Sequence, residues 1–377
     1  MRLLYIANAR MPTEKAHGLQ IMHMCATFAS AGMALELVVP RRKNPLTQDP
    51  FTYYNLKRTF TITTLPVLDT VRFGKIGFYL HTLLFALVAF GYALTKRMDF
   101  VYARDPLLLY LPSFFNKTAV EVHDLPEHKN RLYKFFLRRI PIIISTNQWK
   151  KREMMRAYGI AEEKIIVCPN GINLDEFTVT TPKDVLRAQL HLPQEKKIVM
   201  YTGHLYGWKG AQVLAEAAHF LRGEVLMVFV GGTDKDISRF KEQYERSDIR
   251  IVGRVPHTLI PKYLVCADVV VLPNIPSTRE SRFTTSPIKL FEYMAAGIPI
   301  VASDLPSIRE IIDDTMCAFC IPDDARNLAY TIRSVLENPA DTAQKAKYAQ
   351  HEVRQYTWER RAARIKEEMR AIAHAVI

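Results

Sequence analysis

The strongest constraint on the fold is an alternation of apolar, strand-like runs with helical stretches. The first run, Leu3 to Ala7, leads through a loop into a helical stretch from Gln20 to Ala31 and then into the strand-like run LELVVP. Strand, helix and strand in this order form a βαβ unit with a right-handed crossover and a parallel sheet. Sheets of this kind bind ligands beyond the carboxyl ends of their strands.

The same pattern restarts near the middle of the chain. After a polar stretch around Thr178 to Asp184, the strand-like run KIVMYTG is followed by the helical run AQVLAEAAHFL and the strand-like run EVLMVFVGG. A chain of 377 residues also has the length of two domains. We therefore predict two doubly wound α/β domains facing a central cleft, over 1–180 and 181–355, and a helical segment over 356–377.

Composition and motifs exclude several classes of protein. With 49% hydrophobic and 24% charged residues the chain is globular rather than disordered. Neither half contains G-x-G-x-x-G or G-x-x-x-x-G-K-[ST], which argues against dinucleotide-dependent dehydrogenases and P-loop NTPases. Five cysteines, including an isolated Cys317-x-x-Cys320 pair, favour thiols in a reducing compartment over a zinc site. The start MRLLYIANARM lacks a signal-peptide pattern, so we expect a cytoplasmic protein.

Positive charge is concentrated in the first half of the chain. Residues 1–180 hold 24 Lys and Arg against 14 Asp and Glu, which is +10 of the total of +13. The densest part is Lys129 to Arg156, where aromatic residues are interleaved. Such a face suits anionic lipid, and a merely solvated surface is the alternative. The residues predicted to contact a membrane are Arg138, Arg139, Lys150 and Lys151. No nucleic-acid-binding motif accompanies the charge.

One segment raises the question of a membrane-spanning helix. Ile76 to Leu94 contains no formally charged residue over a length that could cross a bilayer. It also contains His81, Thr82 and two glycines, and it lies between two strand-like runs. We therefore favour a buried or membrane-facing helix of a domain over a spanning helix.

The second half holds two motifs that suit a phosphorylated ligand. In Tyr201 to Gly210 a strand ends in a Gly-rich turn, and Lys209 stands just before a helix, where helix amides and a cation can bind a diphosphate. In Ser286 to Asp304, Glu292 falls in an otherwise apolar helix. A carboxylate there needs partners, which would be either two ribose hydroxyls or a structural ion pair. The amides of Ile288 and Lys289 would face phosphate oxygens, with Pro287 at the first helical position.

Other polar residues are less specific. His123 and Asp124 follow a strand-like run and would point into the cleft, although a lone His is as often a packing residue. Gly18 stands in a loop before the first helix and could cover a diphosphate. Asp234 and Asp236 have the spacing of a metal-binding pair, but we interpret them as part of a solvated loop.

In their order, these motifs resemble the family 4 glycosyltransferases of the GT-B fold, in particular a branch with S-P-x-K-x-F-E-Y-M. Matching segments extend over nearly the whole chain and include V-C-P-N-G-I-N-L-D-E-F at Val167 to Phe177 and F-E-Y-M-A-A-G-I-P-I-V-A-S-D. The resemblance implies two Rossmann-like domains and a C-terminal helix that returns to the first. It also implies retaining, metal-independent transfer of a hexose from a UDP- or GDP-sugar, without a cofactor, to a lipid-linked or cell-surface glycan on the inner face of the cell membrane.

The resemblance also implies roles for individual residues. Lys209 would neutralise the diphosphate, Glu292 would hold the ribose, and the backbone at Arg254 and Val255 would meet the base. The expected catalytic residues are His123, Lys209 and Glu292. The expected donor-binding residues are Gly18, His204, Lys209, Arg254, Val255, Arg282, Thr284, Ile288, Lys289 and Glu292.

Two positions depart from the family pattern. Thr284 stands where many members have an acid, and His204 stands where many have an Arg, for which Arg282 or Lys289 could substitute. These departures leave two alternatives open: a sugar-nucleotide epimerase on the same fold, and a non-catalytic partner of another glycosyltransferase.

Overall fold

The computed structural model describes residues 1–126, 128, 130–205, 207–221, 223 and 225–374. The chain divides into two compact units, unit 1 formed by Met1–Asn170 with the segment from Trp358 onward, and unit 2 formed by Gly171–Thr357. The sequence had suggested divisions after 180 and 355. Lys129, Tyr206 and positions 375–377 of the predicted C-terminal segment lie outside the described residues.

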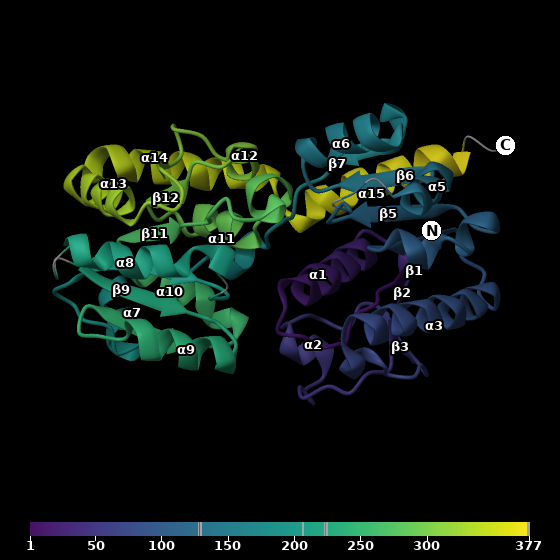
Figure 1. Ribbon diagram of the computed structural model, residues 1–377, viewed down its shortest axis with the longest axis horizontal. Helices are drawn as coiled ribbons and strands as arrows, with labels where there is room; N and C mark the ends of the chain where they lie inside the picture. Colours follow the sequence, from purple (N-terminus) through teal and green to yellow (C-terminus); the bar gives the residue numbers. More distant parts are fainter. Residues whose placement is uncertain (127, 129, 206, 222, 224, 375–377) are drawn as a thin grey trace. The chain divides into compact units, whose positions relative to one another are not determined.

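Unit 1 is built on a seven-stranded parallel sheet in the order β3-β2-β1-β4-β5-β6-β7 (Figure 1). The order reverses between β1 and β4, which makes the sheet doubly wound, as predicted. Apolar side chains of β4 and β5 are buried on both faces, as is typical of parallel strands. The strands are β1 (Arg2–Ile6), β2 (Ala34–Pro40), β3 (Thr61–Leu65), β4 (Phe100–Ala103), β5 (Thr118–Val122), β6 (Ile142–Ser145) and β7 (Ile165–Val167).

Helices cover both faces of this sheet. The helices of unit 1 are α1 (Ala16–Ser30), α2 (Pro50–Tyr53), α3 (Gly74–Leu94), α4 (Pro106–Leu109), α5 (Arg131–Arg139), α6 (Gln148–Tyr158) and α15 (Trp358–His374). Side chains of α3 to α6 share one core with alternate residues of β1, β4, β5 and β6. On the other face, Phe28 of α1 contacts Tyr102 of β4, and α15 packs against α1.

The apolar segment Ile76 to Leu94 forms most of α3. Gly77, His81, Phe85, Ala89 and Ala93, spaced four residues apart, are buried in unit 1. Among the described residues, one helix, Val71–Leu94, is long and apolar enough to cross a membrane by length and composition. Because one face of α3 packs in the core, the helix is part of the unit 1 fold.

Unit 2 is built on a six-stranded parallel sheet in the order β10-β9-β8-β11-β12-β13. Its strands are β8 (Lys197–Thr202), β9 (Val225–Val230), β10 (Ile249–Gly253), β11 (Val269–Leu272), β12 (Ile300–Ser303) and β13 (Ala318–Cys320). The reversal of order between β8 and β11 again gives a doubly wound sheet. The predicted α/β architecture is therefore confirmed in both units.

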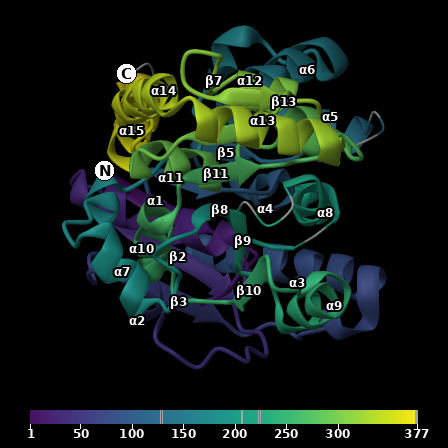
Figure 2. The same cartoon turned by 90° about the vertical axis from the view of Figure 1, so that its left-hand side faces the viewer.

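Two apolar cores lie on the two faces of the unit 2 sheet (Figure 2). The helices of unit 2 are α7 (Lys183–Gln189), α8 (Ala211–Leu221), α9 (Asp234–Tyr244), α10 (Ile260–Cys266), α11 (Ile288–Ala296), α12 (Pro306–Arg309), α13 (Ala325–Glu337) and α14 (Pro339–Glu352). Helices α7, α10, α11 and α14 contribute to one core, and α8, α9 and α13 to the other. All five cysteines of the chain are buried free thiols.

Candidate functional site

The motifs predicted to bind a phosphorylated ligand meet at the switch point of the unit 2 sheet. β8 and β11 are neighbours, and the strand order reverses between them. β8 ends at Thr202 and continues into Gly203, whereas β11 ends at Leu272 and leads through residues 273–287 into α11. Ligands of open parallel sheets bind beyond the carboxyl ends of strands at this point.

Two glycines allow these two loops to approach each other. Gly210 has a φ of +73°, and a Cβ there would lie 1.7 Å from the carbonyl oxygen of Pro273. Gly203 has a φ of +122°, and a Cβ there would lie 2.7 Å from Nζ of Lys289. Only glycine combines this backbone conformation with so little space. Glycine therefore allows a close approach of backbone at Gly210 and of the Lys289 side chain at Gly203.

Two lysine ammonium groups lie at this edge of the sheet. Nζ of Lys289 is buried 3.8 Å from the ring centroid of Tyr201, and no described residue accepts a hydrogen bond from it. Nζ of Lys209 lies 3.7 Å from the ring centroid of Trp208. Burial lowers the pKa of Lys209 to about 8, with Glu280 opposing the effect. Burial and the charge of Lys209 together lower the pKa of Lys289 well below its usual range.

Glu292 has a partner that the sequence analysis did not identify. Its Oε1 lies 2.8 Å from Nε2 of His257, and Nδ1 of the same imidazole lies 3.8 Å from Oε2 of Glu176. Burial acts to lower the pKa of His257, but the hydrogen bond and charge of Glu292, with the charge of Glu176, raise it overall. The carboxylate therefore has a structural ion pair, and Oε2 of Glu292 makes no hydrogen bond to a described residue.

Replacing His257 with Asn should destabilise unit 2 in a pH-dependent way. Since the pKa of His257 is raised on folding, its contribution is fully present below the unfolded pKa and is lost as pH rises through the folded pKa. Leaving Glu292 without its charged partner should cost about 1–3 kcal/mol near pH 6. Thermal unfolding of wild type and H257N from pH 5.5 to 8.5 measures this difference, which should shrink with rising pH. The exposed His351→Asn variant is the control, and a pH-independent difference would contradict the ion pair.

The loop between β11 and α11 carries three further predicted donor residues. Arg282 and Thr284 lie in a π-helical turn, Glu280–Thr284, with Arg282 exposed and Thr284 buried. Ile288 begins α11, where the first backbone N–H groups have no partner within the helix. The sequence analysis placed Pro287 at the first helical position. In the structure Pro287 is the N-cap residue, and α11 begins one residue later, at Ile288.

The remaining donor residues of unit 2 lie after β8 and β10. The carbonyl oxygen of His204 accepts a hydrogen bond of 2.5 Å from the hydroxyl of Tyr201, so this loop is fixed to the same ring that lies under Lys289. Arg254 is exposed directly after β10, and Val255 packs against the core. The backbone at both positions is at the carboxyl edge of the sheet.

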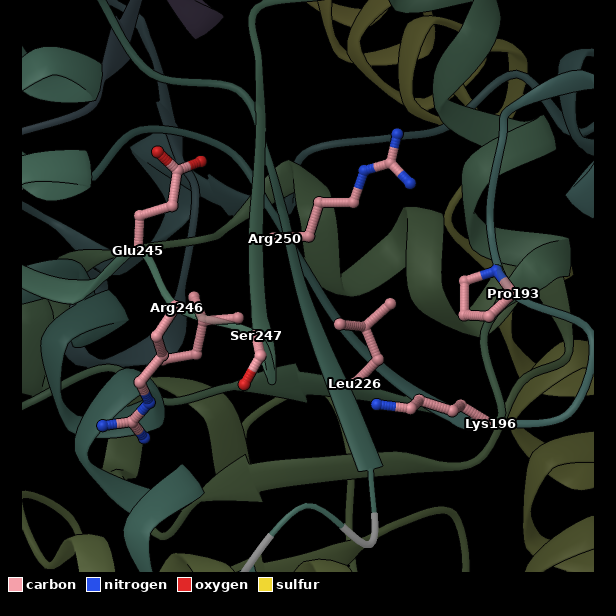
Figure 3. A pocket seen from close by; sticks show the side chains of 8 residues that line it. Pro193, Lys196, Leu226, Glu245, Arg246, Ser247 and Arg250 are labelled. Carbon is pink, nitrogen blue, oxygen red and sulfur yellow. The ribbon is translucent and has the colours of Figure 1, made fainter.

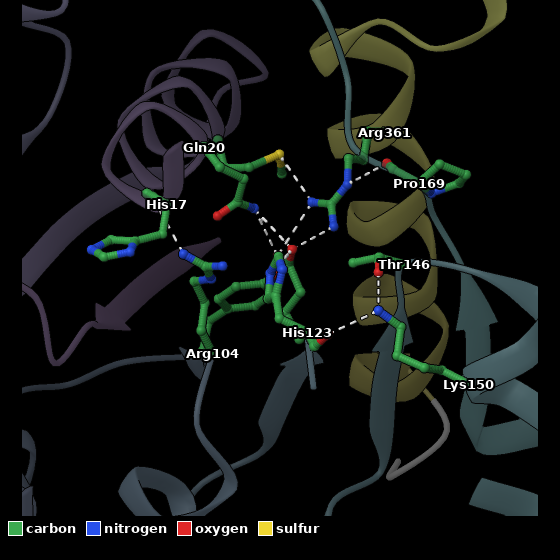
Figure 4. Close-up of polar contacts among 11 residues, drawn as sticks. His17, Gln20, Arg104, His123, Thr146, Lys150, Pro169 and Arg361 are labelled. Atoms are coloured by element: carbon green, nitrogen blue, oxygen red, sulfur yellow. Dashed lines mark hydrogen bonds and ion pairs between the residues drawn. The ribbon is translucent and has the colours of Figure 1, made fainter. Parts of the chain in front are cut away.

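In unit 1, a buried carboxylate organises the corresponding edge of the sheet (Figure 4). Glu121 of β5 is fully buried and accepts hydrogen bonds from Nε2 of Gln20 at 2.8 Å and from the hydroxyl of Tyr102 at 2.5 Å. Nη2 of Arg361, from α15, lies 2.7 Å from its Oε1. Burial acts to raise the pKa of Glu121, but the charge of Arg361, together with His123 and Arg104, holds it well below its usual range. The cluster thus joins β4, β5, α1 and α15.

His123 is held by this carboxylate. Its Nε2 lies 2.5 Å from Oε1 of Glu121, and its carbonyl oxygen accepts a hydrogen bond of 3.0 Å from Nζ of Lys150. Burial and the nearby Arg104 lower the pKa of His123 to about 3, so the ring is neutral at physiological pH. A neutral ring with its proton on Nε2 retains Nδ1 as a hydrogen-bond acceptor.

The structure changes the interpretation of Gly18. Helix α1 begins at Ala16, so Gly18 lies within its first turn rather than in the loop before it. Its N–H donates to the carbonyl oxygen of Lys15 at 2.9 Å, and a Cβ would lie 2.1 Å from the hydroxyl of Tyr54. The need for glycine at this position therefore follows from packing within unit 1, and the expectation that Gly18 covers a diphosphate stays a prediction.

The four residues predicted to contact a membrane differ in their exposure to solvent. Arg138 and Arg139 are exposed on α5, as expected. Lys150, in contrast, is fully buried, because its ammonium group donates to His123 and Thr146. Lys151 is half-buried and forms an ion pair of 2.8 Å with Glu162. The sequence analysis therefore wrongly predicted that Lys150 contacts a membrane. Interleaved polar and apolar residues do not show which lysine side chain is buried.

A surface cavity of about 420 Å³ lies in unit 2, away from the donor motifs (Figure 3). Lys196, Leu226 and Ile249 line it at the amino ends of β8, β9 and β10, the opposite edge from Gly203.

Among the described residues, no group of three or more His, Cys, Asp or Glu side chains could hold a metal ion. Asp236 forms a capping box with Thr233 at the start of α9 rather than standing in a solvated loop.

Sequence reasoning missed the partners that fix the site residues. His257 follows β10 in the segment Pro256-His257-Thr258, directly after the predicted base-binding positions, and its place beside the sheet was the only available signal. Arg361 stands in the Y-T-W-E-R-R-A segment, 240 residues from Glu121, and no local pattern connects the two. Tyr201, which lies under Lys289, was part of the quoted motif without a role.

Two family models match the chain, one in each unit. The model described as "Glycosyltransferase Family 4" matches residues 18–176, and the model described as "Glycosyl transferases group 1" matches residues 196–338. The second match contains Lys209, Lys289, Glu292 and His257.

Curated relatives are similar over part of their length. A D-inositol 3-phosphate glycosyltransferase of Xylanimonas cellulosilytica is 25% identical over 65% of this chain and 61% of its own length. The amylovoran biosynthesis glycosyltransferase AmsK of Erwinia amylovora is 27% identical over 58% of this chain and 53% of its own length. The chain thus spans little more than half the length of these relatives.

Solved structures share the fold over nearly the whole chain. A sucrose-phosphate synthase from Thermosynechococcus elongatus has a TM-score of 0.79 and 19% identity, covering 99% of both chains. Anabaena Alr3699/HepE in complex with UDP-glucose has a TM-score of 0.76 and 17% identity, covering 98% of this chain and 100% of that one. The two family matches indicate a protein of the glycosyltransferase group 1 and family 4 type, and the solved structures show that its fold is GT-B.

Proposed function

We propose that this protein transfers a hexose from a UDP- or GDP-sugar, with retention and without a metal, to a lipid-linked or cell-surface glycan. The observation that carries the proposal is the pair of desolvated lysines, Lys209 and Lys289, at the switch point of the unit 2 sheet. The charges of Glu280 and Glu292 act on these lysines, but no described carboxylate lies within ion-pair distance of either ammonium, so both can take an anionic ligand. A diphosphate supplies that anion. The related Anabaena structure in complex with UDP-glucose supports a sugar nucleotide as the donor.

Each part of the donor has a candidate partner in unit 2. The first-turn N–H groups of Ile288 and Lys289 and the two lysine ammonium groups bind the diphosphate. Oε2 of Glu292 accepts hydrogen bonds from the ribose while His257 holds Oε1. The backbone at Arg254 and Val255 meets the base. These assignments extend the S-P-x-K-x-F-E-Y-M resemblance to this chain.

In the proposed reaction, the bond between the anomeric carbon and the diphosphate oxygen breaks, and a bond to an acceptor hydroxyl oxygen forms on the same face. The negative charge that develops on the leaving diphosphate is stabilised by Lys209 and Lys289. The leaving phosphate oxygen takes the acceptor proton. We assign His123 to the transferred sugar, as the family resemblance implies; its ring is neutral and its Nε2 lies 2.5 Å from Oε1 of Glu121.

Features of unit 1 and one relative support the acceptor class and the location that we propose. One relative is named for biosynthesis of the polysaccharide amylovoran, which favours an envelope glycan as the acceptor class. Arg138 and Arg139 are exposed in a segment, 128–152, whose sequence contains no Asp or Glu. We therefore place the protein in the cytoplasm, peripheral on the inner face of the membrane, with these arginines attracted to anionic lipid.

The test is calorimetric titration with UDP, GDP and ADP, with and without magnesium. We expect one nucleotide to bind without dependence on magnesium and Lys209→Ala to weaken it roughly 30-fold or more, because a buried charge pair is worth about 2 kcal/mol or more. The exposed Lys347→Ala variant should bind like wild type. Since binding favours charged Lys209, affinity should fall as pH rises above about 8.

Other outcomes would favour the alternatives. Failure to bind any nucleotide would favour the non-catalytic partner, a possibility that Thr284 and His204 keep open. Conversion of the donor alone, without an acceptor, would identify an epimerase. Loss of binding in K347A as well as K209A would show that the effect is not specific to the proposed site.

A further inference from the structure

The outward face of α3 is apolar and has no covering element in the described structure. Its large side chains Ile76, Tyr79, Leu80, Leu83, Leu87 and Leu94 are 84%, 71%, 47%, 50%, 50% and 56% exposed. Their spacing of three, four and seven residues places them on one side of the helix, opposite the buried residues from Gly77 to Ala93. At 1.5 Å per residue this face is about 30 Å long.

Exposed apolar side chains are concentrated around this helix. Of the 19 large apolar residues that are exposed in the described structure, 14 lie between Leu68 and Phe135. The other five are scattered over unit 2. Single exposed apolar residues are ordinary, but a contiguous group of this size marks an interaction surface.

Aromatic contacts continue the surface from α3 to α5. Phe90 of α3 lies 5.7 Å from Phe115, and Tyr110 lies 5.4 Å from Phe114 and 5.9 Å from Phe135 of α5 (ring centroids). Phe115 and Phe135 are 69% and 47% exposed. We define the apolar strip as Ile76, Tyr79, Leu80, Leu83, Leu87, Leu94, Phe115 and Phe135. Figure 1 shows the course of α3, which carries six of these side chains.

The charges beside the apolar strip are positive. The segments that form it, 70–98, 106–120 and 128–152, contain no Asp or Glu. Arg72, Lys75 and Arg97 are exposed at the two ends of α3, and the guanidinium of Arg139 lies 3.8 Å from the ring centroid of Phe114. An apolar band bordered by Lys, Arg and aromatic residues matches the boundary between acyl chains and anionic headgroups.

We propose that the apolar strip inserts into the outer part of an anionic lipid bilayer, with α3 lying parallel to the membrane plane. This inference rests on the proposed peripheral location. It differs in the source of the membrane affinity, because insertion of α3 contributes more of the binding free energy than the attraction of Arg138 and Arg139 to anionic lipid. A spanning orientation is excluded by the opposite face of α3, since Phe85, Ala89 and Ala93 are in the core of unit 1. A second copy of the chain is disfavoured as the occupant, because it would bring the same positive border against this one.

The first test is cosedimentation with vesicles of phosphatidylcholine alone and with 3:7 phosphatidylglycerol to phosphatidylcholine. Wild type should bind the anionic vesicles, and Leu83→Gln with Leu87→Gln should reduce the partition coefficient at least tenfold. The control is Tyr330→Gln with Tyr348→Gln, which removes two large side chains of unit 2 that are 67% and 46% exposed. Arg138→Ser with Arg139→Ser should weaken binding less and remove part of its salt dependence.

The second test measures how deeply the apolar strip enters the bilayer. Tryptophan placed at Leu83 should be quenched by brominated acyl chains, whereas tryptophan at Tyr348 should not. Unchanged cosedimentation of L83Q/L87Q, absence of quenching at position 83, or failure of wild type to bind either vesicle would overturn the proposal. Self-association of wild type that L83Q/L87Q abolishes would identify a second copy as the occupant instead. Nucleotide titration of L83Q/L87Q separates these outcomes from failure of the proposed transferase function, because both substitutions lie in unit 1.

Discussion

Lys289→Met is expected to lose nucleotide binding and to fold at least as stably as wild type. In the free protein the Lys289 ammonium is buried over Tyr201 without a hydrogen-bond acceptor, so its charged form is disfavoured. Methionine fills a similar volume without that cost. A bound diphosphate would provide the missing acceptor, and its loss should cost about 2–5 kcal/mol of binding, or roughly 30-fold or more.

Opposite changes in affinity and stability are the diagnostic result. Calorimetric titration with the bound nucleotide gives the affinity, and thermal unfolding without nucleotide gives the stability. The exposed Lys262→Met on α10 should change neither quantity. A variant K289M that binds nucleotide like wild type would remove Lys289 from the site, and a large drop in its unfolding temperature would show that the lysine is structural.

The fold was accessible to sequence reasoning because its signals are local. The strand-like run Leu3 to Ala7 is a continuous apolar segment, and β1 (Arg2–Ile6) covers most of it. The loops that carry Gly203, Lys209 and Lys289 follow strands, so their common edge also follows from the strand order of a doubly wound sheet.

The partners of the site residues were not accessible in this way. His257 and Glu292 are 35 residues apart and on different elements, so their contact depends on how η6 (His257–Leu259) and α11 pack. Lys289 was given a role through its amide and as a possible substitute for the Arg that His204 replaces, but the burial of its ammonium over Tyr201 was not predicted. Gly18 was placed in a loop because Lys15 provides no side-chain cap to mark the start of α1. Burial of a long side chain, as at Lys150, is likewise a tertiary property.

Arg361→Met is expected to destabilise unit 1 by about 3–5 kcal/mol at neutral pH, because it leaves the buried Glu121 carboxylate without its cation. Both side chains are almost fully buried, and Arg361 also donates to the carbonyl oxygen of Pro169 at 2.8 Å. Figure 4 shows Arg361 beside Gln20 and His123. Because Arg361 joins α15 to Glu121 of β5 and α15 packs against α1, the loss should be concentrated in α15 and α1. Native-state hydrogen exchange separates these amides from those of unit 2, and the exposed Arg364→Met is the control on the same helix.

The dependence on pH separates this ion pair from simple loss of packing. In wild type the pKa of Glu121 is held low, so its contribution to stability is present above the unfolded pKa and is lost as pH falls through the folded pKa. Without Arg361, burial should instead raise the pKa of Glu121 above its unfolded value, and protonation in acid would then relieve the cost. The difference between wild type and R361M should therefore shrink as pH falls. The double variant Glu121→Gln with Arg361→Met should recover most of the loss at neutral pH, because it removes the unpaired charge. If the double variant is as unstable as R361M, the guanidinium stabilises α15 through packing and Pro169, and Glu121 is not the reason for its burial.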